Sequence, residues 1–137
     1  AGVDVAGAVA ARLSRQSVLF EPERRFHFVI TEAALRWRMG GSTTMTAQMD
    51  RLANLSTLSN VRLGLIPWRV EVAEFPNNGF DIRDEREVAV ENFTTHPVLT
   101  DHRDVDFHLR MFEYFAEAAI YDDEARTFLA ELTREHA

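Results

Sequence analysis

The heptapeptide FHFVITE at residues 26–32 passes from a strand pattern to the start of a helix without a linker. Its first five residues are aromatic or β-branched apart from one histidine, a composition that is typical of a β-strand. Thr31 can then cap a helix that begins at Glu32, because a carboxylate at this position interacts favourably with the helix dipole. We therefore predict a strand over residues 26–30 and a short helix over residues 32–39, which a glycine pair ends.

The next part of the chain repeats this alternation of helix and strand. After Ser42, apolar side chains recur at helical spacing, and Met45, Met49 and Leu52 share one face. The apolar residues 61–66 then predict a second strand. Strand, helices and strand in this order form a crossover unit. We therefore expect the two strands to be parallel neighbours in one sheet.

The flanking segments complete the predicted fold. We predict a helix over residues 3–20, a loop over residues 67–79, and an antiparallel hairpin that joins residues 80–83 to residues 88–91. A second loop covers residues 94–100. The predicted order is α-β-α-α-β-β-β-α-α, and the predicted class is α+β, with a small mixed sheet of about four strands packed with helices.

Two long helices are predicted in the last third of the chain. The first can be capped by Asp101 or Asp104, and its buried stripe includes Val105 and Phe112. Phe107 and other apolar residues widen this stripe, so we expect this helix to be covered on more than one side. The second helix begins at residue 122 with three acidic residues in its first turn, where they oppose the helix dipole favourably.

Length and composition set limits on the function. The 137 residues are expected to form a single domain over 1–137, and the net charge of −7 is the wrong sign for a self-sufficient nucleic-acid binder. The chain contains no cysteine, which excludes disulfides, thiol catalysis and cysteine-ligated zinc. No apolar run approaches the roughly 20 residues of a membrane helix. No membrane contact is therefore expected, and the expected location is cytoplasmic.

Two carboxylates at predicted strand ends are the main candidates for acid–base chemistry. Glu32 follows one strand and Glu91 ends another, so the two could share a cleft as acid and base. The simpler interpretation is that Glu32 stabilises a helix start and Glu91 pairs with an arginine. Asp104 and His108, four residues apart, could contribute to a metal site, but this spacing is also that of a solvated pair. We expect no enzymatic activity, no metal and no cofactor.

Aromatic residues near the ends of predicted strands are the main candidates for binding. Trp68 and Phe75 lie in the loop after the second strand, and Phe80 begins the hairpin. Loop aromatics can anchor a partner protein or form the wall of an apolar pocket. They can equally fold back over the domain's own core, because large side chains are usually mostly buried.

Short motifs along most of the chain are similar to those of a known family. They are Arg15-Gln16, Glu32-Ala33-Ala34-Leu35, Gly41 followed by Met45, Gln48, Met49 and Leu52, then Asn60-Val61, Ile66-Pro67-Trp68, Gly79-Phe80 and Val90-Glu91. In this order and spacing, the chain resembles the regulatory domain that follows the XRE-type helix-turn-helix in actinobacterial transcription regulators, including WhiJ-like and antitoxin-like regulators. The chain departs from the pattern at Trp68, where phenylalanine is usual, and at Ala89, where tyrosine is frequent.

The resemblance implies a regulatory or interaction domain of a DNA-binding transcription regulator. Such a domain would bind a small cognate partner protein or form a homodimer, and DNA would be contacted only through an N-terminal helix-turn-helix that this chain lacks. The 137 residues would then be a truncated C-terminal regulatory domain. Two alternatives stay open, namely a sensor for a small-molecule effector and a hydrolase that uses Glu32 and Glu91. The candidate binding residues are Glu32, Trp68, Phe75, Phe80 and Glu91.

Overall fold

The computed structural model describes residues 2–5, 21–36, 42–74, 79–90 and 94–136. The strands are β1 (Gly2–Val5), β2 (Phe26–Thr31), β3 (Val61–Ile66), β4 (Phe80–Arg83), β5 (Glu87–Val90) and β6 (Val98–Leu99). The helices in the described part are α2 (Glu32–Arg36), α3 (Ser42–Leu55), α4 (His102–Ala118) and α5 (Asp122–His136). The α+β class expected from the sequence is confirmed.

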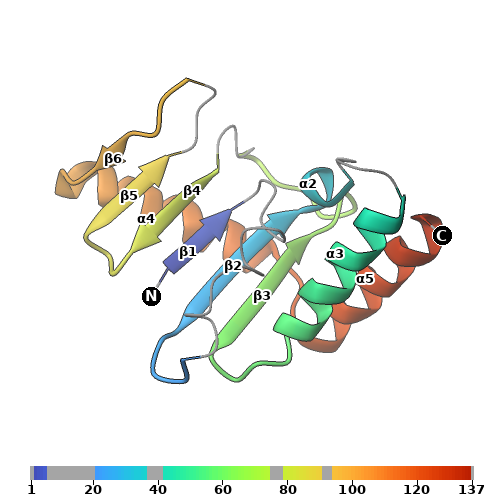
Figure 1. Cartoon of the computed structure of the whole chain (residues 1–137). Helices are drawn as coiled ribbons and strands as arrows, with labels where there is room; N and C mark the ends of the chain where they lie inside the picture. Colours follow the sequence, from blue (N-terminus) through green and yellow to red (C-terminus); the bar gives the residue numbers. More distant parts are fainter. Residues whose placement is uncertain (1, 6–20, 37–41, 75–78, 91–93, 137) are drawn as a thin grey trace.

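The strands form one mixed, six-stranded sheet in the order β3-β2-β1-β4-β5-β6 (Figure 1). β1, β2 and β3 are parallel, whereas β4, β5 and β6 continue the sheet in antiparallel pairs. The predicted parallel pairing of β2 with β3 is therefore confirmed. The predicted hairpin is also confirmed, with its second strand placed one residue earlier than expected.

The alternation of side chains along β2 and β3 divides the core between the two faces of the sheet. Phe28, Ile30 and Leu65 belong to a cluster that includes the apolar faces of α3 and α5. Val29 and Ile66 belong to a second cluster, which α4 covers together with β4 and β5. Figure 1 shows α3 and α5 side by side next to β3, while α4 passes behind the sheet.

The prediction of a helix over residues 3–20 was wrong at its start. Residues 2–5 form β1, and residues 6–20 lie outside the described residues. β1 hydrogen-bonds with β2 on one side and with β4 on the other, so partners distant in sequence override the local helical pattern. The sheet has six strands rather than about four because the sequence pattern also missed β6, a strand of two residues within a predicted loop.

The helices agree more closely with the sequence. α4 is capped by Asp101, whose side chain accepts a hydrogen bond from the Arg103 backbone N–H at 2.9 Å. Phe107, however, is 52% exposed, so the expectation that it is covered was wrong. It lies outside the set of α4 residues that pack on the sheet. α2 ends at Arg36, and residues 37–39 of its predicted extent lie outside the described residues.

Candidate functional site

The candidate site lies where the parallel strands β2 and β3 end. Thr31 and Ile66, the last residues of the two strands, are partners in the register, so the segments that follow them begin side by side. After Thr31 the chain enters α2, and the Thr31 hydroxyl accepts a hydrogen bond from the Ala34 backbone N–H at 3.3 Å. After Ile66 the chain continues through Pro67 to Trp68. Ligands of sheets with parallel strands commonly bind at this end of the strands.

Glu32 is the buried polar residue that joins these two segments. Its side chain lies at the start of α2 and the residue is 5% exposed. One carboxylate oxygen, Oε1, accepts a hydrogen bond from the Trp68 backbone N–H at 2.9 Å. The other, Oε2, accepts one from Nε of Arg36 at 2.5 Å. Glu32 therefore fixes the backbone after β3 to the helix after β2.

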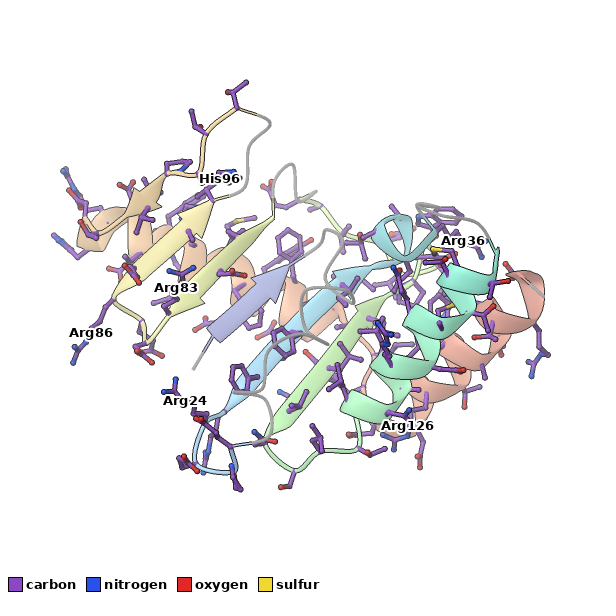
Figure 2. The ribbon with its side chains drawn as sticks, in the orientation of Figure 1. Arg24, Arg36, Arg83, Arg86, His96 and Arg126 are labelled. Atoms are coloured by element: carbon purple, nitrogen blue, oxygen red, sulfur yellow. The ribbon has the colours of Figure 1, made fainter. Side chains whose placement is uncertain are left out.

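Arg36 extends this connection to the Trp68 ring and to the last helix. Its guanidinium carbon lies 4.9 Å from the centre of the indole ring, and its Nη1 donates to Glu135 Oε2 at 2.9 Å. The hydrogen bonds to Glu32 and Glu135 raise the pKa of Arg36 above its ordinary value, so the guanidinium stays charged. Figure 2 shows Arg36 at the α2 end of the sheet.

Trp68 borders an apolar cavity of about 240 Å³. The cavity is lined by Thr31, Ala33, Ile66, Pro67, Trp68, Val70, Val72 and Phe115. Apart from the Thr31 hydroxyl and the indole N–H of Trp68, these side chains carry no hydrogen-bonding group. Although the cavity is apolar, Trp68 itself is 64% exposed. The site thus combines an apolar cavity with a large aromatic side chain that faces solvent.

The structure brings together two of the five residues predicted from the sequence, Glu32 and Trp68. Phe80 is 6% exposed and packs against the His108 ring at 4.9 Å between ring centres, so its assignment to a binding surface was wrong. It is a core residue because it starts a strand of the sheet that α4 covers. Phe75 and Glu91 lie outside the described residues.

Arg36 and Glu135 are parts of this site that were not predicted from the sequence. The spacing of four residues between Glu32 and Arg36 is a helical ion-pair signal that could have indicated the first. No local pattern connects Glu135 with either residue, because its contact with Arg36 depends on how α5 packs on α3 and β3.

The hydrogen bonds of Glu32 bear on the acid–base role considered for it. Both oxygens of Glu32 are engaged in hydrogen bonds, so the carboxylate holds structure together rather than facing the cavity as a free base. Within the described ranges, no group of three or more His, Cys, Asp or Glu side chains could hold a metal ion. His108 bonds through Nδ1 to the Asp104 carbonyl oxygen at 2.8 Å, in place of the metal-binding arrangement considered for this pair.

Fold and site together define an α+β domain in which an exposed tryptophan borders an apolar cavity at the carboxyl ends of parallel strands. The family model of a domain of unknown function (DUF5753) matches residues 1–131, and the chain belongs to that family. A search of curated proteins finds no match to the chain. Among the described residues, no helix is both long enough and apolar enough to span a membrane.

Proposed function

We propose that this domain is the regulatory interaction domain of a DNA-binding transcription regulator and that it binds a partner protein through Trp68 and the adjoining cavity. The observation that carries the proposal is the 64% exposure of Trp68 beside an apolar cavity. Tryptophan is highly buried on average, and exposed aromatic residues that pair with a pocket are frequent anchors of protein interfaces.

The interactions of Trp68 favour a preformed binding surface. Glu32 holds its backbone N–H, and the Arg36 guanidinium lies over its ring. An anchor that is already fixed before binding loses less conformational entropy when the complex forms. This arrangement gives the buried carboxylate a structural role in holding the binding surface.

The size of the cavity favours a protein side chain as its occupant. Its volume of about 240 Å³ lies below the roughly 300–1,000 Å³ of pockets that hold drug-sized ligands. One large apolar side chain of a partner fits this space, while Trp68 packs against the surrounding surface of that partner. A second copy of this chain is the other protein that could supply such a side chain.

The link to transcription rests on the sequence motifs. They resemble the regulatory domain of XRE-type regulators, which act in the cytoplasm, and Ile66-Pro67-Trp68 in the binding surface is one of these motifs. The net charge of −7 supports a role in which a separate helix-turn-helix contacts DNA, because phosphate neutralisation requires basic residues. Both carboxylate oxygens of Glu32 accept hydrogen bonds from described residues, which supports a binding role over hydrolysis.

A comparison of two exposed aromatic residues tests the proposal. We expect Trp68→Ala to weaken binding of the small cognate partner protein that the resemblance implies at least about tenfold, as measured by isothermal titration calorimetry. Phe107→Ala removes an exposed aromatic residue on α4 and should leave the affinity unchanged. Sedimentation over a range of concentrations identifies a second copy as the partner if Trp68→Ala abolishes self-association. Equal binding by wild type and Trp68→Ala would reject this surface.

A small-molecule effector is the second candidate, because the apolar cavity could also enclose a compact ligand. Such a ligand would raise the melting temperature of the wild-type domain by mass action. Ala33 is exposed and lines the cavity, so Ala33→Phe should obstruct it and remove this increase. Absence of any increase across a broad metabolite set would exclude the effector and leave the partner protein.

A further inference from the structure

A second groove lies at the opposite end of the same strands. It has a volume of about 630 Å³ and is lined by Pro22, Arg25, Phe26, His27, Ser59, Asn60, Val61, Arg62 and Asp122. His27 and Arg62 are partners in the register of β2 and β3, so both belong to one face of the sheet. Figure 2 shows Arg24, which precedes the groove residues of β2, at the end of the sheet away from Arg36.

Arg25 and Arg62 contribute two guanidinium groups to this groove. Among the described residues, no acidic side chain forms an ion pair with Arg25 or Arg62. The neighbouring Arg24, by contrast, pairs with Glu21 at 2.7 Å. Arginine side chains with free donors are well suited to bind planar or tetrahedral anions, because the guanidinium presents several N–H groups in a fixed arrangement.

Tyr121 holds Arg62 in place. The Arg62 guanidinium carbon lies 4.0 Å from the centre of the Tyr121 ring, so the face of the cation is covered while the N–H groups at its edge stay available. The ring can approach the sheet this closely because residue 64 is glycine. A Cβ at Gly64 would lie 2.7 Å and 2.8 Å from two carbons of the Tyr121 ring.

Tyr121 also determines which nitrogen of His27 faces a ligand. The Tyr121 hydroxyl donates to the Ala116 carbonyl oxygen at 2.7 Å, so it must accept from His27 Nε2, which lies 2.9 Å away. Burial, together with the charge of Arg62, lowers the pKa of His27 to about 4, which keeps the ring neutral near pH 7. In this neutral ring Nδ1 is an acceptor, and no described residue donates to it.

We propose that this groove binds a small phosphate monoester that carries hydroxyl groups, such as a sugar phosphate. Arg25 and Arg62 bind the phosphate oxygens, while Nδ1 of His27 accepts a hydrogen bond from a ligand hydroxyl. Asp122, the first residue of α5, has a positive φ of 52° and places a second acceptor on the wall of the groove. Two hydrogen-bond acceptors beside two arginines favour a ligand that carries both a negative charge and hydroxyl groups over an anion without hydroxyl groups.

A small ligand also agrees better with the charge of the chain than a nucleic acid does. The net charge of −7 opposes a long polyanion, whereas one phosphate needs only the two local arginines. The groove is at the other end of β2 and β3 from Trp68, so this inference is independent of the proposed partner-binding function.

Calorimetric titration with ribose 5-phosphate, inorganic phosphate and ribose tests the proposal on the whole chain. We expect ribose 5-phosphate to bind at least about tenfold more tightly than either of the other two. Arg25→Gln and Arg62→Gln should each weaken this binding about tenfold. The matched control Arg24→Gln changes the adjacent, ion-paired arginine outside the groove and should bind like wild type, as should Trp68→Ala.

A second measurement needs no substitution. On saturation with ribose 5-phosphate, the ¹⁵N resonance of His27 Nδ1 should shift because the nitrogen gains a hydrogen bond. Failure of ribose 5-phosphate to bind, equal binding by inorganic phosphate, or an unchanged Nδ1 resonance would overturn the proposal. Tighter binding of a single-stranded oligonucleotide than of ribose 5-phosphate would also overturn it, in favour of a nucleic-acid ligand.

Discussion

Glu32 shows how one side chain can satisfy two structural requirements. From the sequence it is a helix-start residue, and in the structure it is indeed the first residue of α2. Its carboxylate also accepts the Trp68 N–H and the Arg36 Nε–H, so two segments of backbone, α2 and the chain after β3, depend on one buried group. A buried carboxylate is tolerated only when such partners compensate for the loss of hydration.

Removing this carboxylate should therefore cost far more than removing an exposed ion pair. We expect Glu32→Ala to lower the free energy of unfolding by about 2–4 kcal/mol, because it leaves the part-buried Trp68 N–H without its acceptor and the Arg36 guanidinium with only Glu135. Arg69→Ala breaks an exposed pair with Glu124 and should cost at most about 0.5 kcal/mol. Urea denaturation measures both, and similar losses in the two variants would contradict the assigned role of Glu32.

The sequence identified part of the candidate site and missed the rest for a physical reason. Glu32 and Trp68 could be predicted because each follows a recognisable strand, and parallel neighbours end at the same edge. The contact between His27 and Tyr121 joins residues 94 positions apart, so no local pattern could predict it. Phe80 was assigned to a binding surface because the sequence alone does not distinguish an aromatic residue that faces solvent at a strand end from one that faces the core.

Among the elements, the β4–β5 hairpin carries backbone strain at its turn. Asp84 and Glu85 have φ values of 52° and 58°, and the Arg86 N–H bonds to the Arg83 carbonyl oxygen at 3.0 Å. Two successive residues with positive φ are typical of type I′ turns, which favour asparagine and glycine. The hairpin nevertheless forms because Ile82 and Val88, opposite each other, are buried in the core.

Glycine at the second of these positions should relieve the strain. We expect Glu85→Gly to raise the free energy of unfolding by about 1 kcal/mol, because glycine adopts positive φ without a Cβ penalty. Glu87→Gly, two residues on within β5, should instead destabilise the domain, since glycine in a strand gains no strain relief and loses conformational entropy on folding. Thermal unfolding of both variants compares them directly, and a destabilised Glu85→Gly variant would be inconsistent with this account of the turn.

The elements that the sequence predicted correctly share a strong periodic signal. β2, β3, α4 and α5 each have a buried stripe that their own residues define. β1 and β6 lack such a signal. β1 is specified by hydrogen bonds to strands far away in the sequence, and β6 by its pairing with β5, a strand of only four residues. Local sequence therefore accounts for β2 and β3 at one end of the mixed sheet and for the β4–β5 hairpin, but not for β1, which lies between them, or for β6 at the other edge.

At the scale of the whole molecule, His27 connects folding stability with pH. Its pKa is about 4 in the folded chain, against an ordinary value of 6.5, because burial and the charge of Arg62 disfavour the protonated ring. Between these two values the unfolded chain binds a proton that the folded chain does not. The contribution of His27 to stability is thus complete above about pH 6.5 and is lost as the pH falls toward 4.

We therefore expect the free energy of unfolding of the wild type to fall by roughly 1–2 kcal/mol through His27 as the pH falls from 6.5 toward 4. This loss is smaller than the full pKa difference implies, because the ring is partly solvated. His27→Gln should remove this part of the pH dependence, since glutamine does not titrate. His102→Gln alters an exposed histidine and should keep the wild-type slope. Urea denaturation between about pH 4.5 and pH 7, roughly the range over which histidine titrates, measures the free energy of unfolding of all three chains. Identical slopes for wild type and His27→Gln would mean that His27 is not held neutral by the fold.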